Sequence, residues 1–199
     1  IRVEAPSGMG VFYGLQTLSQ LIEQNRIPCI TITDRPKYAH RGFMLDCSRH
    51  FWSVDFIKKQ LDAMAFFKLD RFHFHLTDGG GWRLEIKKYP ELTRKTAFRS
   101  HADWDKWIDN GRKFCNPNDA NAYGGYYSQE QIRDIVAYAR ERYITVIPEI
   151  EMPGHSNEVL YTYPELSCTG HGEGFDLCVG NPKTFTFLTD VLQEVMQLF

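Results

Sequence analysis

The sequence lacks both a long apolar run and an excess of charge of one sign. Its 199 residues include 23 Lys and Arg against 25 Asp and Glu, which gives a formal net charge of -2. Proteins that bind polyanions usually carry a basic patch, so this balance argues against nucleic acid as a partner. No apolar segment approaches the roughly 20 residues that a membrane-spanning helix needs. We therefore expect no nucleic acid partner and no membrane span.

Cysteine is scarce and does not follow the spacing of a zinc site. The five cysteines are an odd number, and most are expected to be buried or incidental thiols. Cys168 and Cys178 flank a glycine-rich loop, CTGHGEGFDLC, which a disulfide would close in an oxidising compartment. The spacing leaves both a bridge and two free thiols open. The chain begins at Ile1 rather than at methionine, so we expect a processed or trimmed start, compatible with a removed export signal.

The first 36 residues predict a strand, a helix and a second strand. IRVEAP and IPCITITD favour strands, and GVFYGLQTLSQLIEQ between them repeats apolar residues at helical spacing. The apolar stripe of this expected helix comprises Val11, Leu15, Leu18 and Leu21. Pro36 interrupts regular structure, so we place a domain boundary near residue 36.

Beyond residue 36, strands alternate with amphipathic helices. Strands are predicted over residues 41–48, 71–78 and 143–152. Capping residues begin three helices: Ser53 the first, Ser128 with Gln131 the second, and Asn181-Pro182 the third. The apolar stripes are Ile57, Leu61, Met64 and Ala65 in the first helix, and Ile132, Ile135, Val136 and Ala139 in the second. This alternation predicts an α/β fold with parallel strands joined by right-handed crossovers.

The parallel sheet can belong to an open doubly wound fold or to a (β/α)₈ TIM barrel. No glycine-rich phosphate loop follows any of the three strands, whereas polar residues follow all of them, and barrel enzymes place their active sites there. We therefore favour the barrel. A closed barrel needs eight strands and about 250 residues, so we expect only its N-terminal part in this chain.

Polar side chains gather just beyond the carboxyl ends of the three predicted strands. They are Asp46, Ser48, Arg49 and His50 after the first strand, Asp78 after the second, and Glu149, Glu151 and His155 after the third. Because parallel strands end at one edge, we expect these side chains to converge on one mouth. An arginine can donate to hydroxyls and a carboxylate can accept from them, so the set predicts a sugar-binding site.

Each of these residues also has a structural interpretation when it is taken alone. Arg49 can pair with Asp46 in an ordinary ion pair, and Asp78 can cap the turn that follows it. His73 and His75 are two residues apart on one strand face, which allows a metal pair, although two core histidines are the default interpretation. Their convergence at one rim favours the functional interpretation.

Two long stretches carry several motifs in a fixed order: RGFMLDCSRHFWSVDFIKKQLDAMAFFKLDRFHFHLTDGGGWRLEIKKYPELT and YYSQEQIRDIVAYARERYITVIPEIEMPGHS. They resemble the family-20 glycoside hydrolases, the β-N-acetylhexosaminidases. The resemblance implies the end of a small N-terminal α/β domain over residues 1–36 and the first part of the catalytic barrel over residues 37–199. It implies hydrolysis of terminal, non-reducing β-linked N-acetylhexosamine (GlcNAc or GalNAc) from glycans or glycoconjugates. It implies no cofactor and no metal.

The resemblance assigns roles to four positions. Arg49, in the D-x-x-R-H motif, matches the arginine that binds the outer hydroxyls of the terminal sugar. Asp78, in HLTD, matches the active-site aspartate after the second strand. His155 matches the histidine of the P-G-H motif, and Glu151 stands where many members have Asp.

The glycine run is a departure from the family pattern, because the usual HLTDDQGWR is HLTDGGGWR here. We interpret Gly79 to Gly81 as residues that let the backbone pass close to the sugar pocket without blocking it. Trp82 is expected to pack beneath the rim rather than to stack on the sugar.

The expected mechanism needs residues that this sequence does not contain. Family-20 enzymes are retaining and substrate-assisted: the 2-acetamido oxygen of the sugar attacks and forms an oxazolinium-type intermediate. An adjacent Asp-Glu pair steadies the acetamido group and supplies the general acid. No Asp-Glu dipeptide occurs here, and the resemblance places it just beyond Phe199. A general acid contributes about 10²–10⁴-fold, so we expect these 199 residues alone to be inactive.

Two other functions compete with this reading. A metal-dependent hydrolase on the same barrel would use His73, His75 and His155 as ligands. A non-catalytic carbohydrate-binding protein would bind the sugar without turnover. The resemblance also implies an exported protein, in the bacterial periplasm or at the cell surface, or secreted or lysosomal in a eukaryote.

Overall fold

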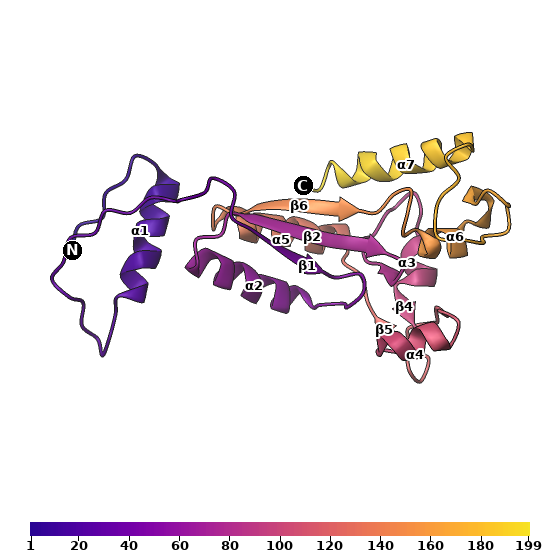
Figure 1. Ribbon diagram of the computed structural model, residues 1–199, viewed down its shortest axis with the longest axis horizontal. Coiled ribbons are helices and arrows are strands. Elements are labelled where there is room, and N and C mark those ends of the chain that lie inside the picture. The colour runs from indigo at the N-terminus through magenta and orange to yellow at the C-terminus, as the bar shows by residue number, and fades with distance from the viewer.

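A parallel β-sheet forms the centre of the protein in the computed structural model, which describes residues 1–199 (Figure 1). Its three parallel strands lie in the order β1, β2, β6, with β2 in the middle. A short strand, β3, pairs antiparallel with the end of β2. The bounds are β1 Gly42–Asp46, β2 Arg71–Asp78, β3 Gly81–Trp82 and β6 Thr145–Ile150. The three predicted strands are confirmed, each within the predicted residues.

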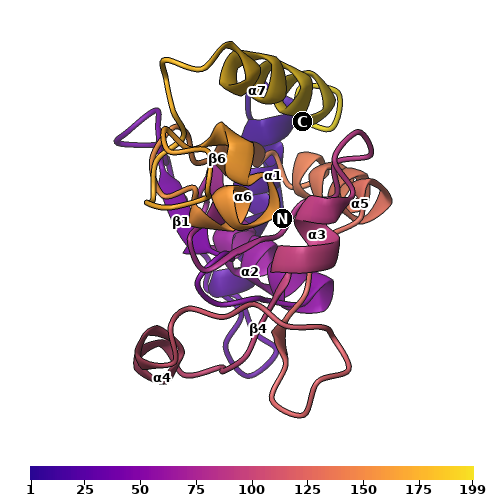
Figure 2. The same cartoon turned by 90° about the vertical axis from the view of Figure 1, so that its right-hand side faces the viewer.

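Three long helices lie around one side of the sheet, as Figure 2 shows. They are α2 (Val54–Phe66), α5 (Gln129–Arg140) and α7 (Pro182–Val195). The side chains of Ser53 and Asn181 accept hydrogen bonds from the first turns of α2 and α7, and Ser128 with Gln131 forms the predicted capping box. Helices α2 and α5 pack against each other, so both crossovers lie on the same face of the sheet.

The hydrophobic core lies between these helices and β2. Phe72, Phe74 and Leu76 alternate along β2, are fully buried, and belong to the same apolar cluster as the predicted stripes of α2 and α5. Alternate residues on a strand point to opposite faces, so His73, His75 and Thr77 point away from the helices. The helices therefore fix which face of the sheet carries the polar side chains.

Two connections at the carboxyl ends of the strands extend beyond the sheet. The connection from β3 to α5 forms a lobe with two short helices and a two-stranded ribbon (Figure 1). Its elements are α3 (Glu91–Thr96), β4 (Phe98–Arg99), α4 (Trp104–Asp109) and β5 (Tyr123–Gly124). The connection from β6 to α7 contains α6 (Asn157–Thr162), the 3₁₀ helix η1 (Pro164–Leu166) and a disulfide between Cys168 and Cys178. The spacing of these cysteines allowed either a disulfide or two free thiols, and the structure has the disulfide.

The N-terminal part differs from the prediction. The helix is present as α1 (Gly8–Gln20), but the strands predicted over residues 1–6 and 27–34 are wrong: neither segment forms a strand. A strand needs a partner for its backbone hydrogen bonds, and these two segments pair neither with each other nor with the sheet. Val11 and Leu15, which belong to the apolar stripe of this helix, are 36% and 49% exposed. No helix of the structure combines the length and hydropathy that a membrane span requires.

Candidate active site

A polar row crosses the sheet near the carboxyl ends of its strands. In the register, Asp46 of β1 lies beside His75 of β2, which lies beside Glu149 of β6. The three side chains therefore share the face that points away from the helices. The ring nitrogens of His75 lie 3.6 to 3.9 Å from carboxylate oxygens of Asp46, Asp78, Glu149 and Glu151. One buried histidine thus lies within 4 Å of four acidic side chains.

Asp78 ends β2, and its two carboxylate oxygens have different partners. The side chain is 6% exposed, and Oδ1 accepts a hydrogen bond from the backbone N–H of Gly79 at 2.6 Å. Oδ2 lies 2.6 Å from Nη2 of Arg49 and 3.1 Å from Nδ1 of His155. A carboxylate this deeply buried needs such partners, because an unpaired charge is costly away from water. Asp78 therefore links the loop after β1 to the loop after β6.

Arg49 makes the ion pair with Asp46 that the sequence offered as a structural interpretation, and it makes a second pair with Asp78. Nη1 pairs with Oδ2 of Asp46 at 2.7 Å, and Nη2 pairs with Asp78. Burial raises the pKa of Asp46, but hydrogen bonds from the backbone and side chain of Arg49 outweigh it, so the pKa of Asp46 is lowered overall. The Arg49 side chain is 41% exposed. The ion pairs therefore fix the guanidinium and leave part of it free to meet a ligand.

Glu151 and His155 lie on the loop that follows β6. The backbone N–H of Glu151 donates to Oγ1 of Thr77 at 2.9 Å, which anchors this loop to β2. His155 has a φ of 51°, in the left-handed region that few non-glycine residues adopt. Its Nδ1 lies 3.7 Å from Oε1 of Glu151, farther than from Asp78. Of these two carboxylates, Asp78 is therefore the nearer partner of His155.

The structure does not gather the three histidines of the metal-site alternative. His73 pairs instead with Glu149, with 2.6 Å between Nε2 and Oε2. The side chains close enough to share a cation are His75, Asp78 and Glu151, whose ligand atoms lie within 4.8 Å of one another.

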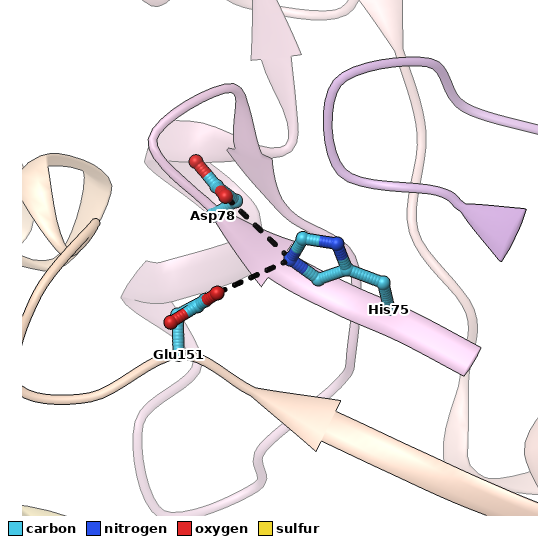
Figure 3. A group of neighbouring side chains, drawn as sticks. All are labelled: His75, Asp78 and Glu151. Carbon is cyan, nitrogen blue, oxygen red and sulfur yellow. Dashed lines mark ion pairs between the residues drawn. The ribbon is translucent and has the colours of Figure 1, made fainter. Parts of the chain in front are cut away.

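Figure 3 shows Asp78 and Glu151 both directed toward the same ring nitrogen of His75, Nε2. That nitrogen lies 3.0 Å from the carbonyl oxygen of Thr77. A carbonyl oxygen can only accept, so Nε2 carries a hydrogen and has no lone pair for a metal ion. In addition, Arg49 already supplies a cation to Asp78. The group fits a network of ion pairs and hydrogen bonds better than it fits a metal centre.

The glycine run is buried against protein groups rather than open to a pocket. A side chain at Gly79 would collide with Asn157, and one at Gly80 would lie 3.1 Å from Cα of Arg49. Gly81 has a φ of 150°, and its Cβ would contact the guanidinium of Arg83. The glycines therefore allow a close approach to protein groups, and the expected approach to a sugar pocket stays a prediction. Trp82 is 1% exposed and donates to the carbonyl of Leu84, so its predicted packing role is confirmed.

The sequence matches the profile described as glycosyl hydrolase family 20, catalytic domain, over residues 38–199. The chain belongs to glycosyl hydrolase family 20. The profile of domain 2 of the same family matches residues 1–35, so the two matches lie on either side of the boundary proposed at residue 36. Membership confirms the fold class: an α/β chain that forms part of a TIM barrel.

Family-20 relatives match nearly the whole of this chain. A beta-hexosaminidase of Porphyromonas gingivalis is 42% identical over 100% of the chain, which covers 26% of that protein. A beta-hexosaminidase of Vibrio furnissii is 38% identical, and the chain covers 34% of it. Among solved structures, the exo-β-N-acetylglucosaminidase of Vibrio harveyi in complex with N-acetylglucosamine has a TM-score of 0.81 and 34% identity, over 98% of this chain and 32% of that one.

The chain therefore spans about a quarter to a third of the length of these family-20 relatives. Within that part, the structure brings Arg49, Asp78, Glu151 and His155 together at one edge. Their roles toward a sugar stay predictions.

Three buried charged residues beside this family-20 site were missed from the sequence. Arg83 and Glu158 are 0% exposed and Arg99 is 2% exposed. Arg83 lies between Trp82 and Leu84. Its place inside an apolar segment is a sequence signal that could have predicted its burial. Glu158 gave no signal, because an acidic residue is ordinary in the first turn of a helix.

Proposed function

We propose that the full-length protein containing these residues removes terminal, non-reducing β-linked N-acetylhexosamine from glycans or glycoconjugates. Membership of family 20 supports the reaction class. The observation that carries the proposal is the convergence of Arg49, Asp78 and His155, because Oδ2 of one buried aspartate contacts both the guanidinium of Arg49 and the imidazole of His155 at the carboxyl edge of the sheet. We propose a retaining, substrate-assisted reaction through an oxazolinium-type intermediate. This route distinguishes the family from most glycosidases, which use two carboxylates.

Arg49 would bind the outer hydroxyls of the terminal sugar. A guanidinium has five N–H groups, and two of them point to Asp46 and Asp78, so three remain for ligand oxygens. Neutral hydroxyls suit this arrangement, because the two carboxylates already balance the charge of Arg49. The ion pairs would hold the guanidinium in place before the sugar arrives, which lowers the entropic cost of binding.

Asp78 would act mainly by holding Arg49 and His155 at fixed positions relative to the sugar. Its carboxylate is 6% exposed, whereas the imidazole of His155 is 60% exposed and can reach a ligand. Oε1 of Glu151 lies 3.7 Å from the same ring nitrogen of His155 that contacts Asp78. The general acid and the acetamido-binding carboxylate would come from an Asp-Glu pair, and none occurs in these 199 residues.

Substrate selectivity tests this proposal. The full-length protein should release nitrophenol from its β-N-acetylglucosaminide or β-N-acetylgalactosaminide and leave the β-glucoside intact, because the acetamido oxygen is the proposed nucleophile. Equal turnover of the glucoside would show that the sugar's own acetamido group is not required. Binding of the acetamido sugar without any turnover would support a carbohydrate-binding protein instead.

We also propose that the protein is exported. The bond between Cys168 and Cys178 supports this, because disulfides persist in oxidising compartments. Cell fractionation with an antibody tests the proposal, and recovery of the protein only from the cytoplasm would refute it.

A further inference from the structure

Arg83 is a fully buried guanidinium that has no carboxylate partner. Its nitrogens donate instead to carbonyl oxygens of four residues. The carbonyl oxygen of Ser48 lies 2.7 Å from Nη2 and 3.2 Å from Nε. The carbonyl of Gly80 lies 3.1 Å from Nη2 and that of Gly125 lies 3.2 Å from Nη1, which also donates to the carbonyl of Ala97. Burial, with the nearby charge of Arg99, lowers the pKa of Arg83 to about 10, so the side chain remains charged at neutral pH. A buried charge without a counter-ion is costly, so its position calls for an explanation.

Arg99 has the same type of environment in the lobe between β3 and α5. It is 2% exposed, and Nη1 donates to the carbonyl of Arg49 at 2.8 Å. Nε and Nη2 donate to the carbonyls of His101 and Ala102 at 2.9 and 2.7 Å. Its guanidinium also lies over the rings of Trp104, Trp107 and Tyr123, at 5.0 to 5.5 Å from their centres.

The two buried arginines hold the peptide groups on either side of Arg49. Arg83 binds the carbonyl of Ser48, which belongs to the peptide before Arg49, and Arg99 binds the carbonyl of the peptide after it. Two fixed peptide planes determine the φ and ψ of the residue between them, and therefore the direction of its Cα–Cβ bond. Gly80 adds a steric limit, because even a methyl group there would lie 3.1 Å from Cα of Arg49.

We propose that Arg83 and Arg99 are positioning residues that fix the backbone of Arg49 and thereby aim its guanidinium at Asp78 and the substrate. This inference rests on the proposed function, in which Arg49 binds the hydroxyls of the terminal sugar. It explains why the lobe between β3 and α5 carries a buried arginine whose Nη1 reaches back to the loop after β1. Lysine cannot replace either residue, because one ammonium cannot span several separated carbonyls in a plane.

A double-mutant cycle in the full-length protein tests the inference. R49K, R99K and the double variant R49K/R99K are compared by kcat/KM for the nitrophenyl acetamido sugar, with thermal unfolding as a check on folding. R99K alone should lose about 10- to 100-fold in kcat/KM, since a small displacement of a binding group is this costly. In the R49K background, R99K should have little further effect, because no guanidinium remains to be aimed. R94K is the matched control, because Arg94 is exposed and pairs with Glu91.

Gly80→Ala gives a second route that removes no buried charge. The added methyl must displace Arg49 or its neighbours by a few tenths of an ångström. It should lower kcat/KM in the wild type and have little effect in R49K, even if R99K fails to fold.

The outcomes separate the two proposals. If R99K and Gly80→Ala reduce kcat/KM by the same factor with and without Arg49, the positioning role is refuted while the proposed function stands. If R49K itself keeps the wild-type kcat/KM, the proposed sugar contact of Arg49 is wrong and the positioning role falls with it. Effects that disappear in R49K support the positioning role.

Discussion

Glu158 should make the folded protein less stable as the pH rises. It lies in the first turn of α6, is 0% exposed, and neither of its carboxyl oxygens has a hydrogen-bond partner. Burial, reinforced by the negative charges of Asp78 and Glu151, raises its pKa to about 8. A proton is therefore bound more tightly in the folded state than in the unfolded state, where the pKa is 4.5.

The difference in pKa gives the size of the effect. The tighter binding of the Glu158 proton stabilises the folded state, and this stabilisation is complete below pH 4.5. It disappears as the pH rises through 8. A difference of 8 minus 4.5, or 3.5 units, corresponds to at most about 5 kcal/mol between these limits. About 3 kcal/mol of this is lost by pH 7. That is a large fraction of the stability of a typical domain.

Glu158→Gln isolates this effect, because glutamine has nearly the same shape as the protonated acid and does not ionise. Urea unfolding of the wild type and of Glu158→Gln is measured at pH 5, 7 and 9. The variant should gain stability relative to the wild type, by about 3 kcal/mol or more between pH 5 and 9. Glu130→Gln, at an exposed site on α5, is the control and should show little change. A wild-type-to-variant difference that stays constant with pH would refute the reasoning.

Three further predictions concern backbone and covalent constraints. Gly81→Ala should destabilise the protein by about 1–3 kcal/mol or more, because it combines an unfavourable φ with a clash against Arg83. Gly111→Ala is the control, because Gly111 has a φ of 74° but no atom close to its Cβ position, and it should cost less stability. If the two variants lost the same thermal stability, the clash with Arg83 would not contribute. Under denaturing, non-reducing conditions the 199 residues should expose three thiols of the five cysteines, and a count of five would exclude the bond between Cys168 and Cys178. Replacing both bonded cysteines with serine should lower stability by about 2–4 kcal/mol in urea unfolding.

The sequence predicts the central elements because their signals are local. The stripe Ile57, Leu61 and Met64 with its cap at Ser53 is sufficient to define α2, and the structure buries all three side chains. The N-terminal segments show the limit of such signals. Residues 27–34 alternate in a way that favours a strand, but a strand forms only when another strand pairs with it.

The location of the site is predictable for a topological reason. Parallel strands end at one edge, so Arg49, Asp78 and Glu151 converge wherever the three strands pair in parallel. The partners within that edge are not predictable in the same way. That His155 contacts Asp78 more closely than Glu151 depends on the path of the loop after β6, and the burial of Arg83 depends on the long lobe before α5.

Asp78→Asn tests the central claim most directly, because it removes the charge that holds Arg49 and His155 together and nearly preserves the shape of the side chain. The measurement is kcat/KM of the full-length protein for the nitrophenyl β-N-acetylglucosaminide, with thermal unfolding to show that the variant folds. We predict a loss of at least about 100-fold, since the two side chains proposed to contact the sugar lose their shared anchor. A folded Asp78→Asn variant with the kcat/KM of the wild type would contradict the assignment of this cluster to the sugar-binding site.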